Sequence, residues 1–162
     1  MSELGFYRFA NNDPDAVAIV EPSEKVWTRG DLLAKTNQLT HALRDFGVQK
    51  GDVVATVLPN SVEYYIAYLA CAQSGFYMVP INWHLAGPEI AYILEDSGAK
   101  AFIASGEVQA MEEACQKAVS AIDFPLDACI STTQMEGFIH LDEFVGSHPT
   151  DNPEDRTAGQ VI

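Results

Sequence analysis

Short apolar runs alternate with amphipathic segments along most of this 162-residue chain. Four continuous apolar runs, at residues 53–58, 76–81, 100–104 and 128–131, predict strands that are buried on both faces. Between these runs, hydrophobic residues recur at the spacing of helices. Strands that alternate with helices are typical of right-handed βαβ units. The sequence therefore predicts an α/β fold with a doubly wound, largely parallel sheet and flanking helices.

Capping residues indicate where the helices begin and end. Thr28 and Asp31 have the spacing of an N-cap and its N3 partner, which predicts a capping box at the first helix. Asn60 is expected to be the N-cap of the second helix, with Glu63 at N3, and Pro88 is expected at the first position of the third. The other boundary signals are glycines and prolines at turns and element ends: Gly47, Gly51, Pro59, Gly75, Pro80 and Gly98.

The two ends of the chain differ from its middle. Residues 16–20 and 25–28 are short β-prone runs on either side of a Pro-Ser turn, and they predict a hairpin. Beyond His148 the composition becomes polar and rich in turn-forming residues. We therefore expect an α/β subdomain at 1–148. Residues 149–162 are expected to be a polar linker followed by the start of a further strand.

The charge balance excludes two classes of partner. Nine Lys and Arg stand against 23 Asp and Glu, for a net charge of −14, which argues against nucleic acid or an acidic membrane surface. No apolar run reaches the roughly 18 residues that a membrane span needs. The three cysteines are odd in number and sit in apolar surroundings, which favours reduced core residues in a cytoplasmic protein.

The residues alone do not indicate a reactive site. The chain contains neither a GxxxxGK[ST] phosphate loop nor a GxGxxG motif, so nucleotide binding by those two routes is unsupported. It also lacks the GxSxG motif of a nucleophilic serine, and its four histidines do not stand at metal-ligand spacing from cysteines or carboxylates.

Several stretches, in order along the chain, resemble the motifs of the adenylate-forming (AMP-binding) enzymes. This superfamily contains acyl-CoA synthetases, luciferases and peptide-synthetase adenylation domains. Residues 26–33 (VWTRGDLL) resemble its first motif, and residues 46–63 (FGVQKGDVVATVLPNSVE) resemble its pattern G-V-x-K-G-D-x-V-A-x-x-L-P-N-x-x-E. Residues 72–82 (AQSGFYMVPIN) are similar to the second motif, and residues 89–100 continue the likeness. Asn82 and the WHL after it are most similar to the fatty-acid–CoA ligase branch.

The motif residues also have structural explanations. Asp52 is expected to bond turn amides before a buried strand, Gly75 to permit a tight helix-to-strand turn, and Pro80 to end a strand. We assign no catalytic and no metal-binding residue within the chain. The structural motif residues are Thr28, Asp31, Gly51, Asp52, Pro59, Asn60, Glu63, Gly75, Pro80 and Gly98.

The resemblance implies that the chain is the N-terminal subdomain of a longer acyl-CoA synthetase. Such an enzyme uses ATP, magnesium and CoA to convert a carboxylic acid, fatty or related, into an acyl-adenylate and then an acyl-CoA. Its phosphate loop, magnesium ligand and catalytic lysine would follow Ile162, so the 162 residues alone are expected to be inactive and to carry no bound cofactor. In CoA-forming relatives a cation after the P-I-N segment can approach CoA, which makes Asn82 and His84 the CoA-binding candidates.

Two alternatives stay open. The parent enzyme could deliver its acyl group to a carrier protein instead of CoA. The chain could also be a complete, non-catalytic α/β module that serves a binding partner. Under the main hypothesis, a sheet cut at Ile162 would expose apolar surface and a strand edge, so we expect the isolated chain to self-associate.

Overall fold

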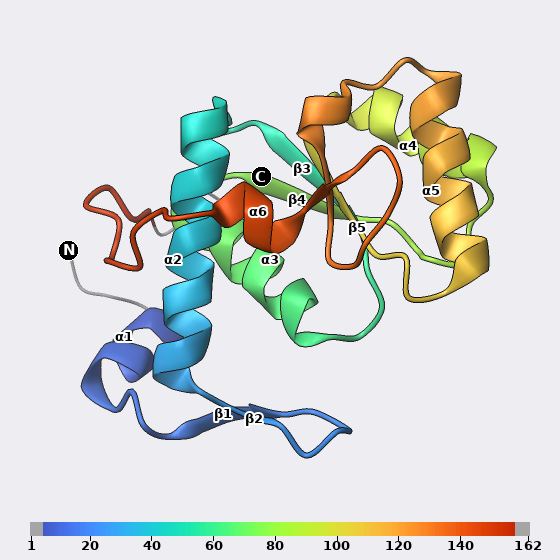
Figure 1. Ribbon diagram of the computed structural model, residues 1–162. Helices are drawn as coiled ribbons and strands as arrows, with labels where there is room; N and C mark the ends of the chain where they lie inside the picture. The colour runs from blue at the N-terminus through green and yellow to red at the C-terminus, as the bar shows by residue number, and fades with distance from the viewer. Residues whose placement is uncertain (1–4, 158–162) are drawn as a thin grey trace.

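A parallel sheet lies between two layers of helices in the computed structural model, which describes residues 5–157 (Figure 1). Each pair of neighbouring strands within this sheet is parallel. The prediction that the four apolar runs are parallel neighbours is therefore confirmed. In spatial order the described strands are β4 (Tyr77–Pro80), β3 (Val53–Val57), β5 (Ala99–Ala104), β6 (Cys129–Ser131) and β7 (Ile139–His140).

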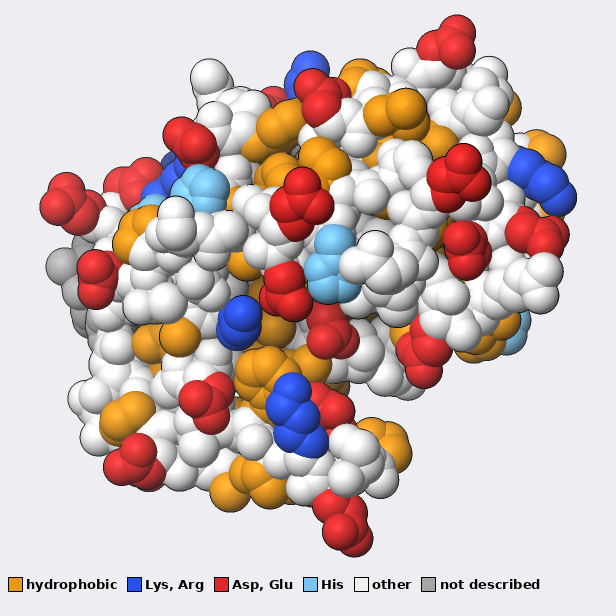
Figure 2. Space-filling model, in the orientation of Figure 1, with side chains coloured by type: hydrophobic (Ala, Val, Ile, Leu, Met, Phe, Trp, Pro, Cys, Tyr) orange, Lys and Arg blue, Asp and Glu red, His pale blue; other side chains and the backbone are white. Residues whose placement is uncertain are grey.

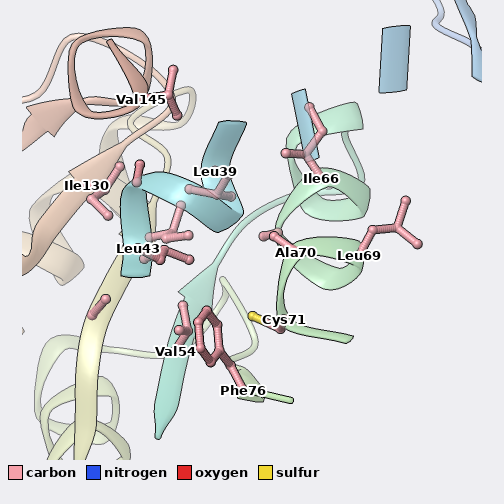
Figure 3. Packing of buried hydrophobic residues seen from close by; sticks show 14 of the residues in the cluster. Leu39, Leu43, Val54, Ile66, Leu69, Ala70, Cys71, Phe76, Ile130 and Val145 are labelled. Carbon is pink, nitrogen blue, oxygen red and sulfur yellow. The ribbon is translucent and has the colours of Figure 1, made fainter. Parts of the chain in front are cut away.

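Helices cover both faces of the sheet, as the doubly wound prediction requires. The helices α2 (Arg29–Phe46), α3 (Val62–Ser74) and α6 (Leu141–Val145) pack on one face, where Leu43, Ile66 and Val145 join strand residues such as Val54 and Ile130 in one core cluster (Figure 3). The helices α4 (Gly87–Ser97) and α5 (Gln109–Ala121) pack on the other face in a second cluster. Alternate residues of β3 and β5 enter alternate clusters, which explains why these strands are apolar on both sides.

The N-terminal part of the chain packs outside these layers. Helix α1 (Gly5–Asn12) lies against α2 through Tyr7 and Ala10. Strands β1 (Val17–Val20) and β2 (Val26–Thr28) pair antiparallel, which confirms the predicted hairpin. None of the helices in the described residues is both long and apolar enough to cross a membrane. On the face shown in Figure 2, acidic side chains are scattered widely and Lys or Arg appear at only a few separate points.

The helix starts confirm one capping prediction and correct two. At α2, the Thr28 hydroxyl accepts a hydrogen bond from the Asp31 amide and the Asp31 carboxylate accepts one from the Thr28 amide, both at 3.1 Å, so the capping box is confirmed. The prediction that Asn60 caps α3 was wrong, because Ser61 is the N-cap and its hydroxyl accepts from the Tyr64 amide at 3.3 Å.

The later start of α3 has a packing reason. With Ser61 extended, Val62 becomes the first helical residue and is buried in the core, and Glu63 takes the second position instead of the third. At α4, Pro88 is also the second helical residue and not the first, because the helix begins at Gly87. A proline is tolerated at either position, since neither amide has a partner within the helix.

Residues 149–157 have no helix or strand but are held against α2 and α3 by hydrogen-bonded polar side chains, which we call the clasp (Asn37, Thr40, Gln73, Asn152 and Arg156). The Gln73 amide nitrogen donates to Asn37 Oδ1 at 3.1 Å and to Thr40 Oγ1 at 2.6 Å, and its oxygen accepts from Arg156 Nε at 3.0 Å. A domain boundary at residue 148 stays a prediction. The strand predicted at 160–162 lies outside the described residues.

Candidate ligand-binding site at the carboxyl end of strand β4

The two predicted CoA-binding residues lie where β4 ends and the chain turns into α4. Doubly wound sheets bind ligands beyond the carboxyl ends of their strands. The Asn82 side-chain oxygen accepts a hydrogen bond from the His84 backbone amide at 3.0 Å, which folds this segment into a tight turn. Both side chains are exposed. Asn82 therefore shapes the turn, and His84 is the residue that the turn presents to solvent.

The neighbouring tryptophan holds the orientation of His84. The rings of Trp83 and His84 are stacked, with centroids 3.5 Å apart and planes inclined by 30°. Trp83 is half-buried and packs against the core cluster beneath α4 and α5, so it is anchored to the body of the protein. The imidazole thus rests on a fixed aromatic platform and can still offer hydrogen bonds to a ligand.

A hollow of about 460 Å³ opens beside this platform, and we call it the His84 hollow. Its wall on one side is the turn and first residues of α4, and its wall on the other is one face of α5. It brings together the predicted residue His84 and a cation that the sequence did not indicate, Lys117. The hollow is lined by residues 83–88 and by Val108, Ala110, Met111, Glu113, Ala114 and Lys117.

The charged groups of the hollow are weakly engaged. Lys117 Nζ lies 3.8 Å from a carboxylate oxygen of Glu113, and both side chains are mostly exposed, at 72% and 51%. The other oxygen of Glu113 accepts from Gln109 at 3.1 Å. An exposed pair of this kind contributes little to stability, about 0–1 kcal/mol. Lys117 is therefore available to an anionic ligand at little cost to the fold.

Of the other motif residues, Pro80 ends strand β4 as predicted, and the rest lie at turns and helix ends. Asp52 accepts a hydrogen bond from the Gln49 amide at 2.8 Å across a turn. At Gly51 and Gly75 the backbone has φ of 93° and 71°, a conformation that L side chains rarely adopt, and the Gly51 amide donates to the Gly75 carbonyl at 2.9 Å. These two turns meet beside the amino ends of β3 and β4. Their contacts serve the fold, and none of these residues lines the His84 hollow.

The buried cysteines are not candidates for nucleophiles. Cys71, Cys115 and Cys129 are unpaired and buried, and burial raises the pKa of each thiol to about 12. Among residues 5–157, His, Cys, Asp and Glu side chains form no group of three or more that could hold a metal ion.

The sequence profile of the AMP-binding enzyme family matches residues 6–156. The chain is 42% identical, over 95 residues, to the long-chain-fatty-acid–CoA ligase FadD13 of Mycobacterium tuberculosis. It is 36% identical, over 91 residues, to the fatty acid–[acyl-carrier-protein] ligase ScoC of Streptomyces coeruleorubidus. These alignments cover 58% and 56% of this chain but only 19% and 17% of those proteins.

The structure shows the same likeness over nearly the whole chain. It superposes on a Mycobacterium tuberculosis fatty acyl CoA synthetase with a TM-score of 0.73 and 31% sequence identity, covering 94% of this chain and 29% of that one. The chain thus spans less than a third of the length of this structural relative. The His84 hollow lies within the profile match.

Proposed function

Because the chain belongs to the AMP-binding enzyme family, we propose that it is the N-terminal part of an ATP-dependent acyl-CoA synthetase. The observation that carries this proposal is the profile match over residues 6–156, together with the likeness to fatty-acid ligases in sequence and structure. The substrate class we propose is a carboxylic acid, fatty or related. We also propose a cytoplasmic location, which the three buried, unpaired cysteines support.

The proposed reaction has two steps. A carboxylate oxygen attacks the α-phosphorus of ATP, and pyrophosphate leaves to give an acyl-adenylate. The CoA thiol then attacks the acyl carbon, AMP leaves, and a thioester remains. We assign neither step to a side chain of this segment, because within residues 5–157 no three His, Cys, Asp or Glu side chains are grouped as a metal site and the three thiols are buried. Its contribution is the sheet that fixes the position of the His84 hollow.

We propose that Asn82 and His84 act in the second step by binding CoA. The Asn82 turn and the Trp83 stack hold His84 at the mouth of a hollow, and a histidine there can donate a hydrogen bond to a phosphate, charge-assisted when protonated. A purely structural His84 would instead be expected to bond the protein itself, as His148 does to the Val145 carbonyl at 2.7 Å.

Two measurements test the proposed reaction. The reading frame beyond Ile162 should encode a Thr/Ser- and Gly-rich loop that ends in Pro-Lys. The purified full-length enzyme should then release AMP in a manner that depends on both CoA and an acid from a panel of carboxylic acids. AMP release that requires a carrier protein instead of CoA would favour the carrier-dependent alternative. The 36% identity to ScoC supports that alternative. No nucleotide turnover with any acid would contradict the proposal.

For the isolated 162 residues we propose a folded but inactive and self-associating protein. Among the described strands β4 pairs only with β3, so no other described strand covers its outer edge, and Val17, Val20 and Val26 of the hairpin are each at least half exposed. We expect cooperative melting, no shift of the melting temperature with millimolar ATP and magnesium, and a dimer or larger species by light scattering. Acid-dependent pyrophosphate release from this chain would contradict the proposed inactivity, and a strictly monomeric chain would contradict the association.

A further inference from the structure

We infer that Lys117 is the phosphate-binding side chain of the His84 hollow. We also infer that Gly87, which has no side chain, lets α5 pack close enough to α4 for Lys117 to line the hollow. The inference rests on the proposed function, because the ligand it names is the phosphorylated adenosine end of CoA. Among the Asp, Glu, Lys and Arg side chains, the lining of the hollow contains Glu113 and Lys117. Lys117 is therefore the ammonium group there that can form a charge-assisted hydrogen bond to a phosphate.

Gly87 brings the two walls of the hollow into close contact. It is buried at the first turn of α4, where a Cβ atom would lie 3.0 Å from the Lys117 Cβ and 3.1 Å from the Ala114 carbonyl oxygen. A side chain at residue 87 would push α5 away from α4. The side chain of Lys117 thus starts against α4 and extends into the hollow that α4 and α5 share.

A phosphate could displace Glu113, the ion-pair partner of Lys117 in this structure. Glu113 lies one turn before Lys117 on α5, and the 3.8 Å separation of their charged atoms in a mostly exposed pair is a weak interaction. Glu113 would also keep its hydrogen bond from Gln109 if the lysine moved. A phosphate carries more charge than a carboxylate and accepts several hydrogen bonds, so it competes well for the ammonium group.

The aromatic platform explains why the ligand should be a nucleotide and not phosphate alone. Trp83 and His84 are already stacked, and a purine ring can extend such a stack in the hollow. An adenine on this platform would leave its phosphates near the α5 wall, where Lys117 lies. Base and phosphate would then be recognised by residues from two different walls.

The inference can be tested on the 162-residue chain with adenosine 3′,5′-bisphosphate as the probe. In a two-dimensional NMR titration at physiological ionic strength, the indole N–H signal of Trp83 should shift and saturate below about 20 mM. The indole N–H signal of Trp27, which lies in the hairpin, should not shift and serves as an internal control. ADP should bind more weakly, and inorganic phosphate should leave the Trp83 indole unmoved.

Lys117→Gln should raise the dissociation constant about fivefold or more, the size expected for one charge-assisted contact. Gly87→Ala should raise it as well. Lys35→Gln is the matched control, because Lys35 is also a helical lysine in a weak ion pair, 3.7 Å from Asp142, although its side chain is less exposed than that of Lys117. Unchanged binding by Lys117→Gln, or no Trp83 shift at the highest concentration, would overturn the inference.

The two proposals fail separately. If Lys117 binds the bisphosphate but the full-length enzyme makes no acyl-CoA, the proposed reaction is refuted and the Lys117 site is retained. An active CoA ligase whose CoA KM is unchanged by Lys117→Gln would keep the reaction and remove the site.

Discussion

The clasp around Gln73 and the His84 hollow are two polar regions of the molecule that differ in how deeply their side chains are buried and how fully they are hydrogen bonded. In the clasp, both ends of the Gln73 and Asn37 amides are hydrogen bonded, and both side chains are almost fully buried. In the hollow, His84 and Lys117 are exposed, and the ion pair of Lys117 with Glu113 is weak. Buried polar groups that are fully bonded specify a fold, while exposed polar groups around a hollow are available to a ligand.

The largest effect should follow from breaking the clasp. Gln73→Leu removes one acceptor and one donor group, so Asn37, Thr40 and Arg156 each lose the hydrogen bond that they make with Gln73. We expect the free energy of unfolding to fall by about 2–3 kcal/mol, because buried polar groups are then desolvated without compensation. Urea denaturation measures this. Gln49→Leu, at an exposed position, is the control and should change stability by less than about 0.5 kcal/mol. Equal effects of the two substitutions would show that the clasp does not hold the fold.

A smaller and pH-dependent effect is expected at the α2 capping box. Hydrogen bonds from the Thr28 hydroxyl and amide lower the pKa of Asp31 below its ordinary value. The folded state therefore gains stability above the unfolded pKa of about 3.9 and loses it as the pH falls through the lower folded pKa. Asp31→Asn should destabilise the protein at pH 7 by up to about 1 kcal/mol, because the carboxylate is exposed and screened.

The same comparison at acidic pH checks the cause of that effect. The difference in unfolding free energy between Asp31→Asn and the native chain should shrink as the pH is lowered below about 4. A difference that is constant between pH 7 and pH 3 would mean that the charge of Asp31 does not contribute.

The smallest effect on stability is expected in the hollow. His84→Ala and Lys117→Ala should each change the free energy of unfolding by less than about 0.5 kcal/mol, because both side chains are exposed and neither holds a buried partner. Thermal melting of the two variants beside Gln73→Leu measures the contrast directly. If His84→Ala lowers the free energy of unfolding by more than about 1 kcal/mol, His84 has a structural role like that of the clasp residues.

The sheet could be predicted from the sequence because its strands are apolar on both faces, which leaves a signal in each strand alone. Helix α1 was missed because Tyr7 and Ala10 are the two residues it buries, and that burial depends on docking against α2. Strand β7 was missed because it has only two residues. The error at Asn60 arose because Asn60 and Ser61 are adjacent and both suit an N-cap, so local preference could not choose between them.

The contacts of the clasp and the hollow could not be predicted in the same way. The bond from Asn37 to the Thr150 carbonyl spans 113 positions, and nothing in a polar, turn-rich segment indicates that Pro153 will be buried. His84 was proposed as a binding residue because of its motif, and that role stays a prediction. Lys117 carries no motif, and its only local signal is the pair with Glu113, which is typical of any exposed helix. Its place in the hollow depends on the packing of α5 against Gly87.

The most direct test of the account is the kinetic effect of His84→Ala on the two half-reactions of the full-length enzyme. If the hollow binds CoA, the substitution should raise the CoA KM several-fold and leave acid-dependent pyrophosphate release unchanged, since the first step does not involve CoA. An equal loss in both half-reactions would contradict the account and would mean that His84 supports the fold and does not bind the second substrate.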